Sequence, residues 1–287
     1  MVKRRGGRER ARTPLTLRLY NRFVHKYWAR DVGFELQLMA RREAALYIAR
    51  HMTGATMYAD RWQLLSAAIE AAAPNGLFLE LGVGKGASAN FIARCIDRLA
   101  APGTLHAFDS FEGLPEDWAG TAERAGKFSL HGKIPALLPN IVVHQGGFDD
   151  TLPRFCDKVA HAGIAFAHID CDLYSSTHTV FNRLGGLLRT GSILVFDEYF
   201  NYHGWQNHEF KAWQEFVRAR SVRYCYRGFC TRGGSVYVRI EGIDGAEGTG
   251  AATDSVARSA AAGNAMTVGG RRVRLAVRSD GAVPSGE

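Results

Sequence analysis

The sequence predicts an α/β fold, with a doubly wound, mostly parallel sheet that carries helices on both faces. Three observations predict it. Short apolar segments alternate with segments of helical periodicity from residue 77 to residue 219. A glycine-rich turn separates the first apolar segment from the helical segment after it. Acidic residues directly follow later apolar segments, at the strand ends where open α/β sheets bind their ligands.

Each element follows from its own residue pattern. Apolar, β-branched and aromatic runs predict parallel strands at 77–81, 104–108, 140–145, 164–169 and 192–196. Between and after them, helical spacing predicts helices at 87–100, 150–160, 175–189 and 208–219. Asp150 is the expected N-cap of the second of these helices. Residues 223–229 and 235–240 predict a terminal antiparallel hairpin, which is a common addition to such sheets.

The N-terminal part is predicted to be a helical extension, residues 14–75. Apolar and aromatic residues recur at helical spacing across residues 15–50, which indicates one or two helices. A further helix is expected from Tyr58 to about Ala72, where Pro-Asn-Gly ends it. The domain that carries the glycine turn then spans residues 76–240.

Both ends of the chain have compositions typical of disorder. Residues 1–13 contain six basic side chains and one acid, and residues 241–287 are rich in Gly, Ala and Ser. The first segment alone accounts for +5 of the net charge of +8. The centre of the chain is therefore only mildly basic, and no nucleic-acid partner is expected.

No apolar run reaches the roughly 18 residues that indicate a membrane span. The basic N-terminus is not followed by the apolar segment of a secretory signal. The five cysteines include no Cys-x-x-Cys pair, so neither a disulfide framework nor a zinc site is indicated. Free thiols in a reducing compartment fit this pattern, and a cytoplasmic protein is expected.

The glycine turn places Gly82, Gly84 and Gly86 at alternate positions. Such a turn between a strand and a helix lets the backbone approach a ligand closely. Residues 82–87 also match the Gly-x-Gly-x-x-Ala pattern of dinucleotide sites. A P-loop is excluded, because Lys85 is followed by glycine rather than by Ser or Thr. The glycines alone therefore do not decide which class of cofactor binds. They also do not distinguish a cofactor site from an ordinary tight turn.

Two acids favour one class of cofactor. Glu80 lies just before the turn, where it would repel a pyrophosphate and attract a cationic amino-acid group. S-adenosylmethionine carries an ammonium and a sulfonium and no phosphate. Asp109 follows the next strand, where it can accept hydrogen bonds from the ribose hydroxyls of either cofactor. An NAD-dependent oxidoreductase and a non-catalytic cofactor-binding module remain alternatives.

Four acids follow two later strands: Asp170, Asp172, Asp197 and Glu198. Clustered carboxylates repel unless a cation or a proton joins them, and oxygen-only ligands suit Mg²⁺. In the alternative interpretation, Asp172 caps the next helix and Glu198 is solvated. His168 shares a strand face with Asp170 but lies about 6.6 Å deeper along the strand, so a buried core histidine is expected there.

Residues 110–135 form a polar segment that is too long for a simple connection, and a lid or an acceptor-binding role is expected for it. The segment contains Trp118 and His131. His131 is a candidate catalytic base, although a loop histidine is usually just exposed.

Five motifs, between about residues 76 and 220, together resemble the class I S-adenosylmethionine-dependent methyltransferases, particularly the macrocin O-methyltransferase-like family: "LFLELGVGKGASANFIA", "FDSFEGLPEDWAGT", "GGFDDTLP", "HIDCDLYSST" and "FDEYFNYHGWQNHEFKAWQEF". The resemblance implies a seven-stranded sheet and methyl transfer to a hydroxyl of a small-molecule acceptor, such as a sugar or a glycosylated metabolite. The N-terminal helices, which it does not reach, are candidates for covering the active site or for pairing with a second subunit.

The resemblance also implies roles for individual residues. An adenine pocket is expected near residues 147–149. Cofactor contacts are implied for Glu80, Gly82, Gly84, Gly86, Asp109, Ser110, Phe111, Gly147, Phe148, Asp149 and Asp170. A divalent cation, Mg²⁺ or similar, is implied on Asp170, Asp197 and Glu198, where related chains often have aspartate in place of Glu198. Asp170 would then also take part in catalysis.

Overall fold

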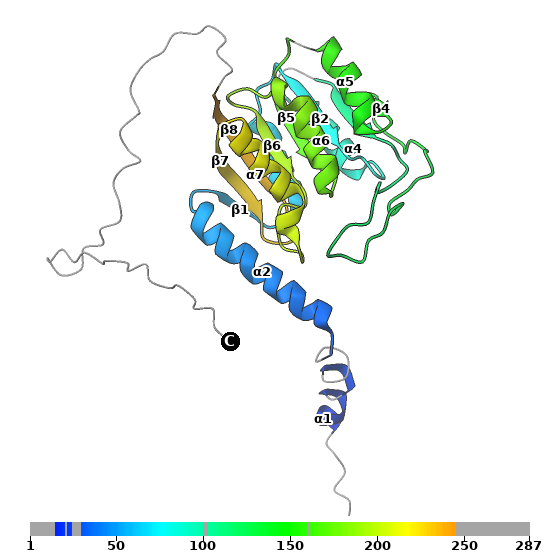
Figure 1. Cartoon of the computed structure of the whole chain (residues 1–287), viewed down its shortest axis with the longest axis vertical. Coiled ribbons are helices and arrows are strands. Elements are labelled where there is room, and N and C mark those ends of the chain that lie inside the picture. The colour runs from blue at the N-terminus through cyan, green and yellow to red at the C-terminus, as the bar shows by residue number, and fades with distance from the viewer. Residues whose placement is uncertain (1–14, 21, 25–29, 100–102, 160, 245–287) are drawn as a thin grey trace, which may run out of the picture. The chain divides into compact units, whose positions relative to one another are not determined.

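The computed structural model describes residues 15–20, 22–24, 30–99, 103–159 and 161–244 (Figure 1). The predicted tail at residues 1–13, and residues 245–287 of the second predicted tail, lie outside the described residues.

An eight-stranded sheet forms the centre of the described chain, with the strand order β1-β7-β8-β6-β5-β2-β3-β4. Among the described strands, only β8 is antiparallel to its neighbours. The strands are β1 (Thr56–Tyr58), β2 (Leu77–Leu81), β3 (Leu105–Asp109), β4 (Ile141–Gln145), β5 (Ile164–Ile169), β6 (Ile193–Phe196), β7 (Val222–Cys230) and β8 (Val236–Ile243). The doubly wound α/β prediction is confirmed, and the strand order reverses between β2 and β5.

The sheet has one strand more than the predicted seven. The additional strand is β1, which pairs in parallel with β7 and includes Tyr58. The helix predicted from Tyr58 therefore begins later, as α3 (Arg61–Glu70). Asp60 is its N-cap, and its Oδ1 accepts hydrogen bonds from the backbone nitrogens of Trp62 and Gln63 at 3.0 Å. The cap fixes the helix start and leaves the residues before Asp60 free to pair with the sheet.

Helices cover both faces of the sheet (Figure 1). On one face, α3 and α4 (Ala87–Ile96) pack over a core that contains Leu65, Ile92 and Phe166. On the other face, α5 (Phe148–Lys158), α6 (Tyr174–Leu184) and α7 (Glu209–Ala219) pack over a core that contains Phe155, Phe181 and Trp213. Burial of these apolar faces stabilises the layers by roughly 25 cal/mol per Å².

The one or two helices predicted over residues 15–50 are confirmed: this part of the chain includes the α-helices α1 (Leu15–Tyr20) and α2 (Val32–His51). α2 packs beside α7, where the rings of Tyr47 and Phe210 meet edge to face with centroids 5.3 Å apart. Short 3₁₀ turns follow α6 at Gly185–Leu187 and precede α7 at Trp205–Asn207.

Other predicted boundaries are wrong as well: α4 ends at Ile96 and α6 at Leu184, earlier than predicted. α5 begins at Phe148 with Gly147 as its N-cap, so Asp150 lies inside the helix instead of capping it. β8 continues to Ile243, which places part of the predicted second tail in the sheet, opposite Val222 of β7.

None of the helices in the described ranges is long and apolar enough to cross a membrane. The five cysteines are free, as their spacing predicted.

Candidate active site

The glycine turn joins β2 to α4, and its glycines serve different purposes. Gly82, Gly84 and Gly86 all have positive φ, at 94°, 51° and 79°. A Cβ on Gly82 would overlap the carbonyl oxygen of Asp170, and a Cβ on Gly86 would lie 2.6 Å from Leu137. At Gly84, in contrast, nothing lies within 4 Å of the Cβ position. Within this turn, Gly84 is therefore the glycine that leaves open space for a ligand.

Asp109 closes the glycine turn from the neighbouring strand β3. Its Oδ2 accepts hydrogen bonds from the backbone nitrogens of Val83 and Gly84, at 2.7 and 2.8 Å. Its Oδ1 accepts a hydrogen bond from the backbone nitrogen of Phe111 at 2.7 Å. A carboxylate has about four lone-pair positions, so about one position, on Oδ1, remains for the predicted ribose contact. This structural role of Asp109 in the glycine turn was not predicted.

Glu80 lies opposite His168 in the pairing of β2 with β5, and both side chains are fully buried. The Nδ1 of His168 lies 3.1 Å from Oε1 of Glu80, whereas Oε2 of Glu80 is buried without a hydrogen-bond partner among the described residues. Burial alone would lower the pKa of His168, but Asp197 and Glu80 together raise it to about 10. The prediction of a buried histidine is confirmed, while its pairing with Glu80 was missed.

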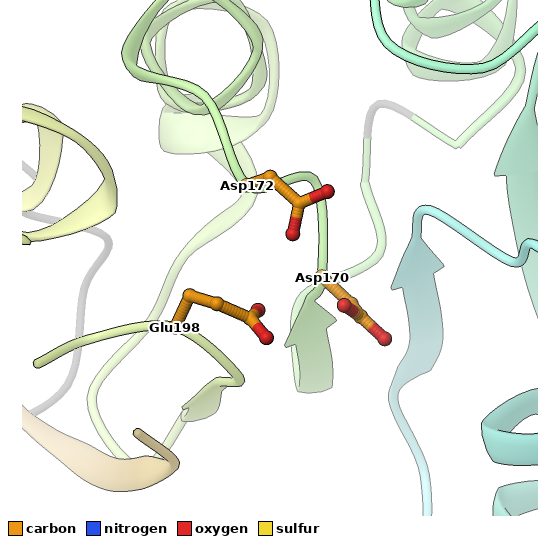
Figure 2. A group of neighbouring side chains, drawn as sticks. All are labelled: Asp170, Asp172 and Glu198. Atoms are coloured by element: carbon orange, nitrogen blue, oxygen red, sulfur yellow. The ribbon is translucent and has the colours of Figure 1, made fainter. Parts of the chain in front are cut away.

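Three carboxylates converge where β5 and β6 end (Figure 2). Asp170, Asp172 and Glu198 each offer an oxygen, and these oxygens all lie within 4.8 Å of one another. Ligand atoms of one hard cation lie about that far apart or closer, since each is about 2.0–2.6 Å from the ion. Oε2 of Glu198 is buried and has no hydrogen-bond partner among the described residues. The group has the donor chemistry and the spacing of a divalent-cation site.

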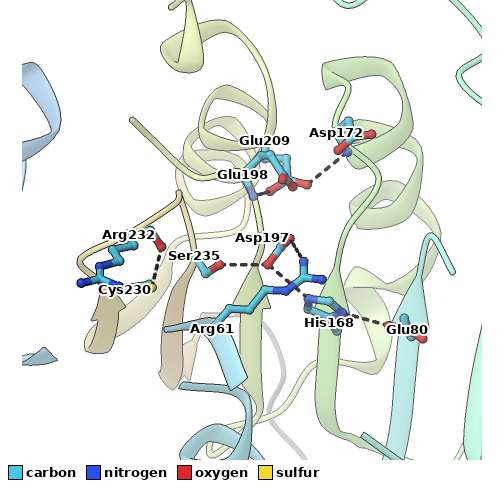
Figure 3. Close-up of polar contacts among 10 residues, drawn as sticks. All are labelled: Arg61, Glu80, His168, Asp172, Asp197, Glu198, Glu209, Cys230, Arg232 and Ser235. Carbon is cyan, nitrogen blue, oxygen red and sulfur yellow. Dashed lines mark hydrogen bonds and ion pairs between the residues drawn. The ribbon is translucent and has the colours of Figure 1, made fainter. Parts of the chain in front are cut away.

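Asp197, which was predicted to be a metal ligand, does not belong to this group. Its Oδ2 accepts a hydrogen bond from Nη1 of Arg61 at 2.7 Å, and its Oδ1 accepts one from Oγ of Ser235 at 2.9 Å (Figure 3). Asp172 takes its place among the three converging carboxylates. Arg61 lies more than 130 residues before Asp197 in the sequence, so the pairing was not visible as a motif.

Glu209, at the start of α7, is a further buried acid of the site that sequence reasoning missed. Its Oε1 accepts a hydrogen bond from the backbone nitrogen of Asp172, and its Oε2 accepts one from that of Glu198 (Figure 3). The only signal in the sequence is its place inside the "FDEYFNYHGWQNHEF" segment that the resemblance already included.

The electrostatics separate Asp197 from its neighbours. Burial raises the pKa of Asp170 and Glu198 well above the usual range, and repulsion by Asp197 adds to it. Burial and Asp197 likewise raise the pKa of Asp172 to about 7. Burial also opposes ionisation of Asp197, but His168 and Arg61 more than compensate and lower its pKa to about 2. The three converging carboxylates thus lack the cation that Asp197 already has.

Residues 79–199 match the family model described as a methyltransferase domain. The chain contains a methyltransferase domain. The glycine turn and the doubly wound sheet agree with class I, whose members use S-adenosylmethionine. The macrocin-like family is not singled out by this match and stays a prediction. A comparison with curated proteins finds no match.

Solved structures of methyltransferases are similar to this chain. The calicheamicin methyltransferase CalS11 is 22% identical over 71% of this chain and 82% of its own, with a TM-score of 0.50. The O-methyltransferase NovP is 21% identical over 62% of this chain and 78% of its own, with a TM-score of 0.42. An O-methyltransferase from Bacillus cereus, solved with S-adenosylhomocysteine, is 14% identical over 78% of this chain and 96% of its own, with a TM-score of 0.40. At these identities the likeness concerns the fold alone.

In the methyltransferase, the segment between β3 and β4 lies against the same rim. Trp118 packs edge to face on Tyr202, with ring centroids 5.4 Å apart, and near His208. Nε2 of His208 lies 2.9 Å from the carbonyl oxygen of Ala119. The hydroxyl of Ser175 in α6 donates to Glu116 of the same segment. The segment is thus held against the elements that follow β5 and β6.

His131 is not brought to the three carboxylates. Its side chain is exposed, and the next residue, Gly132, accepts a hydrogen bond from Gln145 at the end of β4. β4 is three strands away from β5 in the sheet, which corresponds to roughly 14 Å between strand axes. His131 therefore has no supporting contact for the predicted role of catalytic base.

The other predicted cofactor residues lie near the ends of β3 and β4. Phe111 is a core residue with a positive φ of 60°, and Oγ of Ser110 accepts a hydrogen bond from the backbone nitrogen of Glu112. Gly147 and Phe148 start α5, and Asp149 in its first turn forms an exposed ion pair with Arg183 at 3.3 Å. The predicted adenine pocket at these residues stays a prediction.

Proposed function

We propose that the methyltransferase transfers the methyl group of S-adenosylmethionine to a hydroxyl oxygen of a small-molecule acceptor. The observation that carries the proposal is the convergence of Asp170, Asp172 and Glu198 beside the glycine turn. Gly82 lies directly against the backbone of Asp170, so the glycine turn and the carboxylates share one edge of the sheet. A hydroxyl acceptor needs a group that orients it and takes its proton, and carboxylates can do both.

The cofactor is proposed to bind with its amino-acid part at Glu80 and its ribose at Asp109. The unpartnered Oε2 of Glu80 is a buried acceptor that an ammonium group would satisfy. Gly84 leaves room for the backbone to approach the ligand. Oδ1 of Asp109 has one protein partner and keeps some capacity for a ribose hydroxyl.

A divalent cation such as Mg²⁺ is proposed to bind Asp170, Asp172 and Glu198. The fit rests on the spacing of their oxygens, on the unpartnered Oε2 of Glu198 and on carboxyl groups that lack a compensating charge. When bound, such an ion lowers the pKa of a hydroxyl next to it. Asp197 is left out because Arg61 and Ser235 already occupy its oxygens.

The reaction is an in-line displacement. The acceptor oxygen forms a bond to the methyl carbon while the bond from that carbon to sulfur breaks, which leaves S-adenosylhomocysteine and releases the hydroxyl proton. The protein mainly aligns the donor with the acceptor and excludes water. Without a bound cation, Asp172, with a pKa of about 7, is the carboxylate best matched to accept a proton near neutral pH.

The acceptor is proposed to be a sugar or a glycosylated metabolite. Carboxylates are acceptors for the neighbouring hydroxyls of a sugar, and aromatic side chains stand beside them at this rim, including Trp118 and Tyr202. CalS11, which has a similar fold, is a calicheamicin methyltransferase. Oligomeric state and cytoplasmic location stay predictions.

Calorimetry with S-adenosylhomocysteine and with NAD tests the cofactor first. Binding of S-adenosylhomocysteine without NAD binding supports the proposal, and the reverse result would identify an oxidoreductase instead. Radiolabelled methyl transfer to a panel of nucleotide sugars, glycosides and phenols then tests the acceptor. A protein that binds the cofactor but methylates none of the panel would favour the non-catalytic alternative.

A further inference from the structure

Four ionisable side chains, acidic and basic in turn, form a chain of contacts: Glu80, His168, Asp197 and Arg61 (Figure 3). They come from β2, β5, the end of β6 and the start of α3. His168 lies 3.1 Å from Glu80 through Nδ1 and 3.9 Å from Asp197 Oδ1 through Nε2. Arg61 then meets the other oxygen of Asp197 at 2.7 Å. We call these residues the charge line.

The inner members of the charge line are hidden from solvent. Glu80 and His168 are 0% exposed, and Asp197 is 6% exposed. Burying an ionised group is costly unless opposite charges and hydrogen bonds compensate it. Glu80 has such a neighbour in Nδ1 of His168, and Asp197 has one in Arg61. Nε2 of His168 faces Asp197 at 3.9 Å without a hydrogen bond. The orientation of the Glu80 carboxylate therefore depends on His168, and the position of His168 depends in turn on Asp197.

Arg61 is the end of the charge line that reaches solvent, with 37% of its side chain exposed. It is the first residue of α3, where the helix dipole disfavours a cation. Its guanidinium also lies 4.6 Å from the ring centre of Trp62. The ion pair with Asp197 offsets the unfavourable interaction of the Arg61 charge with the helix dipole. It also connects α3 to the buried residues Asp197 and His168.

We propose that Arg61 is a positioning residue for the cofactor, acting through Asp197 and His168 to hold Oε2 of Glu80 toward the cofactor. This inference rests on the proposed binding of S-adenosylmethionine at Glu80. Arg61 itself is not proposed to touch the cofactor or the acceptor. Its effect is transmitted by the contacts of the charge line, over the neighbouring strands β6, β5 and β2.

A direct effect of the Arg61 charge on the ligand, without any positioning, would change ligand affinity differently, so the two explanations can be tested against each other. Removing the positive charge of Arg61 should, through space alone, favour a more cationic ligand. S-adenosylhomocysteine has a neutral thioether, whereas sinefungin carries an amine in place of the sulfonium. Loss of positioning should weaken both ligands, while a through-space effect should leave S-adenosylhomocysteine unchanged and tighten sinefungin.

The experiment measures the affinity of the full chain for both ligands by calorimetry, in EDTA so that metal binding does not contribute. Arg61→Met removes the charge and keeps the length, and Arg61→Lys keeps the charge. Arg223→Met is the matched control. It also replaces an arginine of an ion pair by methionine, but the pair, with Asp244, is exposed and lies outside the charge line. Circular dichroism and thermal unfolding establish that each variant is folded.

We expect Arg61→Met to weaken both ligands by about five- to tenfold, in the range of coupling between separate sites. Arg61→Lys should recover most of this loss, and Arg223→Met should bind like the wild type. His168→Asn, which keeps a donor toward Glu80 but loses the contact with Asp197, should resemble Arg61→Met.

Two results would overturn the inference in different ways. If folded Arg61→Met binds S-adenosylhomocysteine as tightly as the wild type, the positioning role is wrong and the proposed function is untouched. If the wild type itself does not bind S-adenosylhomocysteine, the proposed cofactor is wrong and the inference falls with it. As an independent readout, the imidazole nitrogen signals of His168 in ¹⁵N spectra should shift in Arg61→Met and not in Arg223→Met.

Discussion

Oε1 of Glu209 accepts a hydrogen bond from the backbone nitrogen of Asp172 at 3.3 Å. The other oxygen, Oε2, accepts one from the backbone nitrogen of Glu198 at 3.2 Å. Asp172 follows β5 and Glu198 follows β6, so one buried side chain of α7 ties together the two segments that carry the converging carboxylates. Asp172 also has a positive φ of 63°, an uncommon conformation for aspartate, which such contacts help to hold.

Replacing Glu209 should therefore affect activity more than its distance from the reacting atoms suggests. Glu209→Ala leaves two backbone N–H groups without their acceptors, and the free energy of unfolding should fall by about 1–3 kcal/mol. Glu209→Gln keeps the shape but only one acceptor oxygen, so it should be intermediate. Methyl transfer and urea unfolding measure the two effects, and a fully active Glu209→Ala would refute the role of Glu209 in arranging the site.

Activity should depend on a divalent cation held by Asp170, Asp172 and Glu198. EDTA should abolish methyl transfer, and added Mg²⁺ should restore it. Asp172→Asn should raise the Mg²⁺ concentration for half-activation by about 10- to 100-fold, whereas Asp197→Asn, outside the group, should change it by about twofold at most. Full activity in EDTA would exclude the metal and leave Asp172 as the proton acceptor to test next.

Asp109 should stabilise the glycine turn even before a ligand binds. Asp109→Ala removes the acceptor for the backbone nitrogens of Val83, Gly84 and Phe111. We expect a loss of about 1.5–3 kcal/mol in cofactor binding, since a charged acceptor is lost, together with lower stability. Calorimetry with S-adenosylhomocysteine and thermal unfolding measure both. Unchanged affinity in a folded Asp109→Ala would show that neither the turn nor the ribose depends on this carboxylate.

Acid should destabilise the protein through a histidine pair on the outer strands of the sheet. Burial, and repulsion by His106, lower the pKa of His144 to about 4 in the folded state. In the unfolded chain this pKa is about 6.5. Between these values only the unfolded state binds the proton, so stability is complete above about pH 6.5 and falls as the pH is lowered toward 4.

Urea unfolding of wild type and His144→Gln at pH 7 and pH 5 measures this contribution. The wild type should lose more stability between the two pH values than His144→Gln does. The exposed His178 provides the matched control, and His178→Gln should keep the wild-type pH dependence. Equal pH dependence in wild type and His144→Gln would contradict the prediction.

Two C-terminal truncations should differ although only four residues separate them. A chain that ends at residue 244 keeps β8 and its pairs with β7 and should unfold cooperatively like the full chain. A chain that ends at residue 240 loses the pair Val222↔Ile243 and the ion pair between Arg223 and Asp244, and its melting temperature should be lower. Equal melting temperatures would show that the end of β8 contributes nothing. Removal of residues 1–13 is expected to leave folding intact.

The layers of the fold were predictable because they follow from local patterns. The fully buried strand Ile164–Ile169 reads as a continuous apolar run, and the amphipathic α7 has apolar residues at helical spacing. β1 escaped prediction because it is short and mostly exposed, and because its pairing with β7 joins residues more than 170 positions apart. The start of α5 was misplaced because its N-cap is a glycine without a capping side chain.

In the candidate active site, too, some features could be predicted from the sequence and others could not. The sequence by itself determined that Glu80, the glycine turn, Asp109 and several acids stand at the carboxyl ends of parallel strands, because strand periodicity and topology fix which ends meet. Only the tertiary structure decided how each acid is used: Asp197 pairs with Arg61, Asp172 joins Asp170 and Glu198, and Glu209 holds both segments. The physical reason is that a carboxylate's charge, partner and pKa depend on distances of a few ångströms between segments that are remote in the sequence.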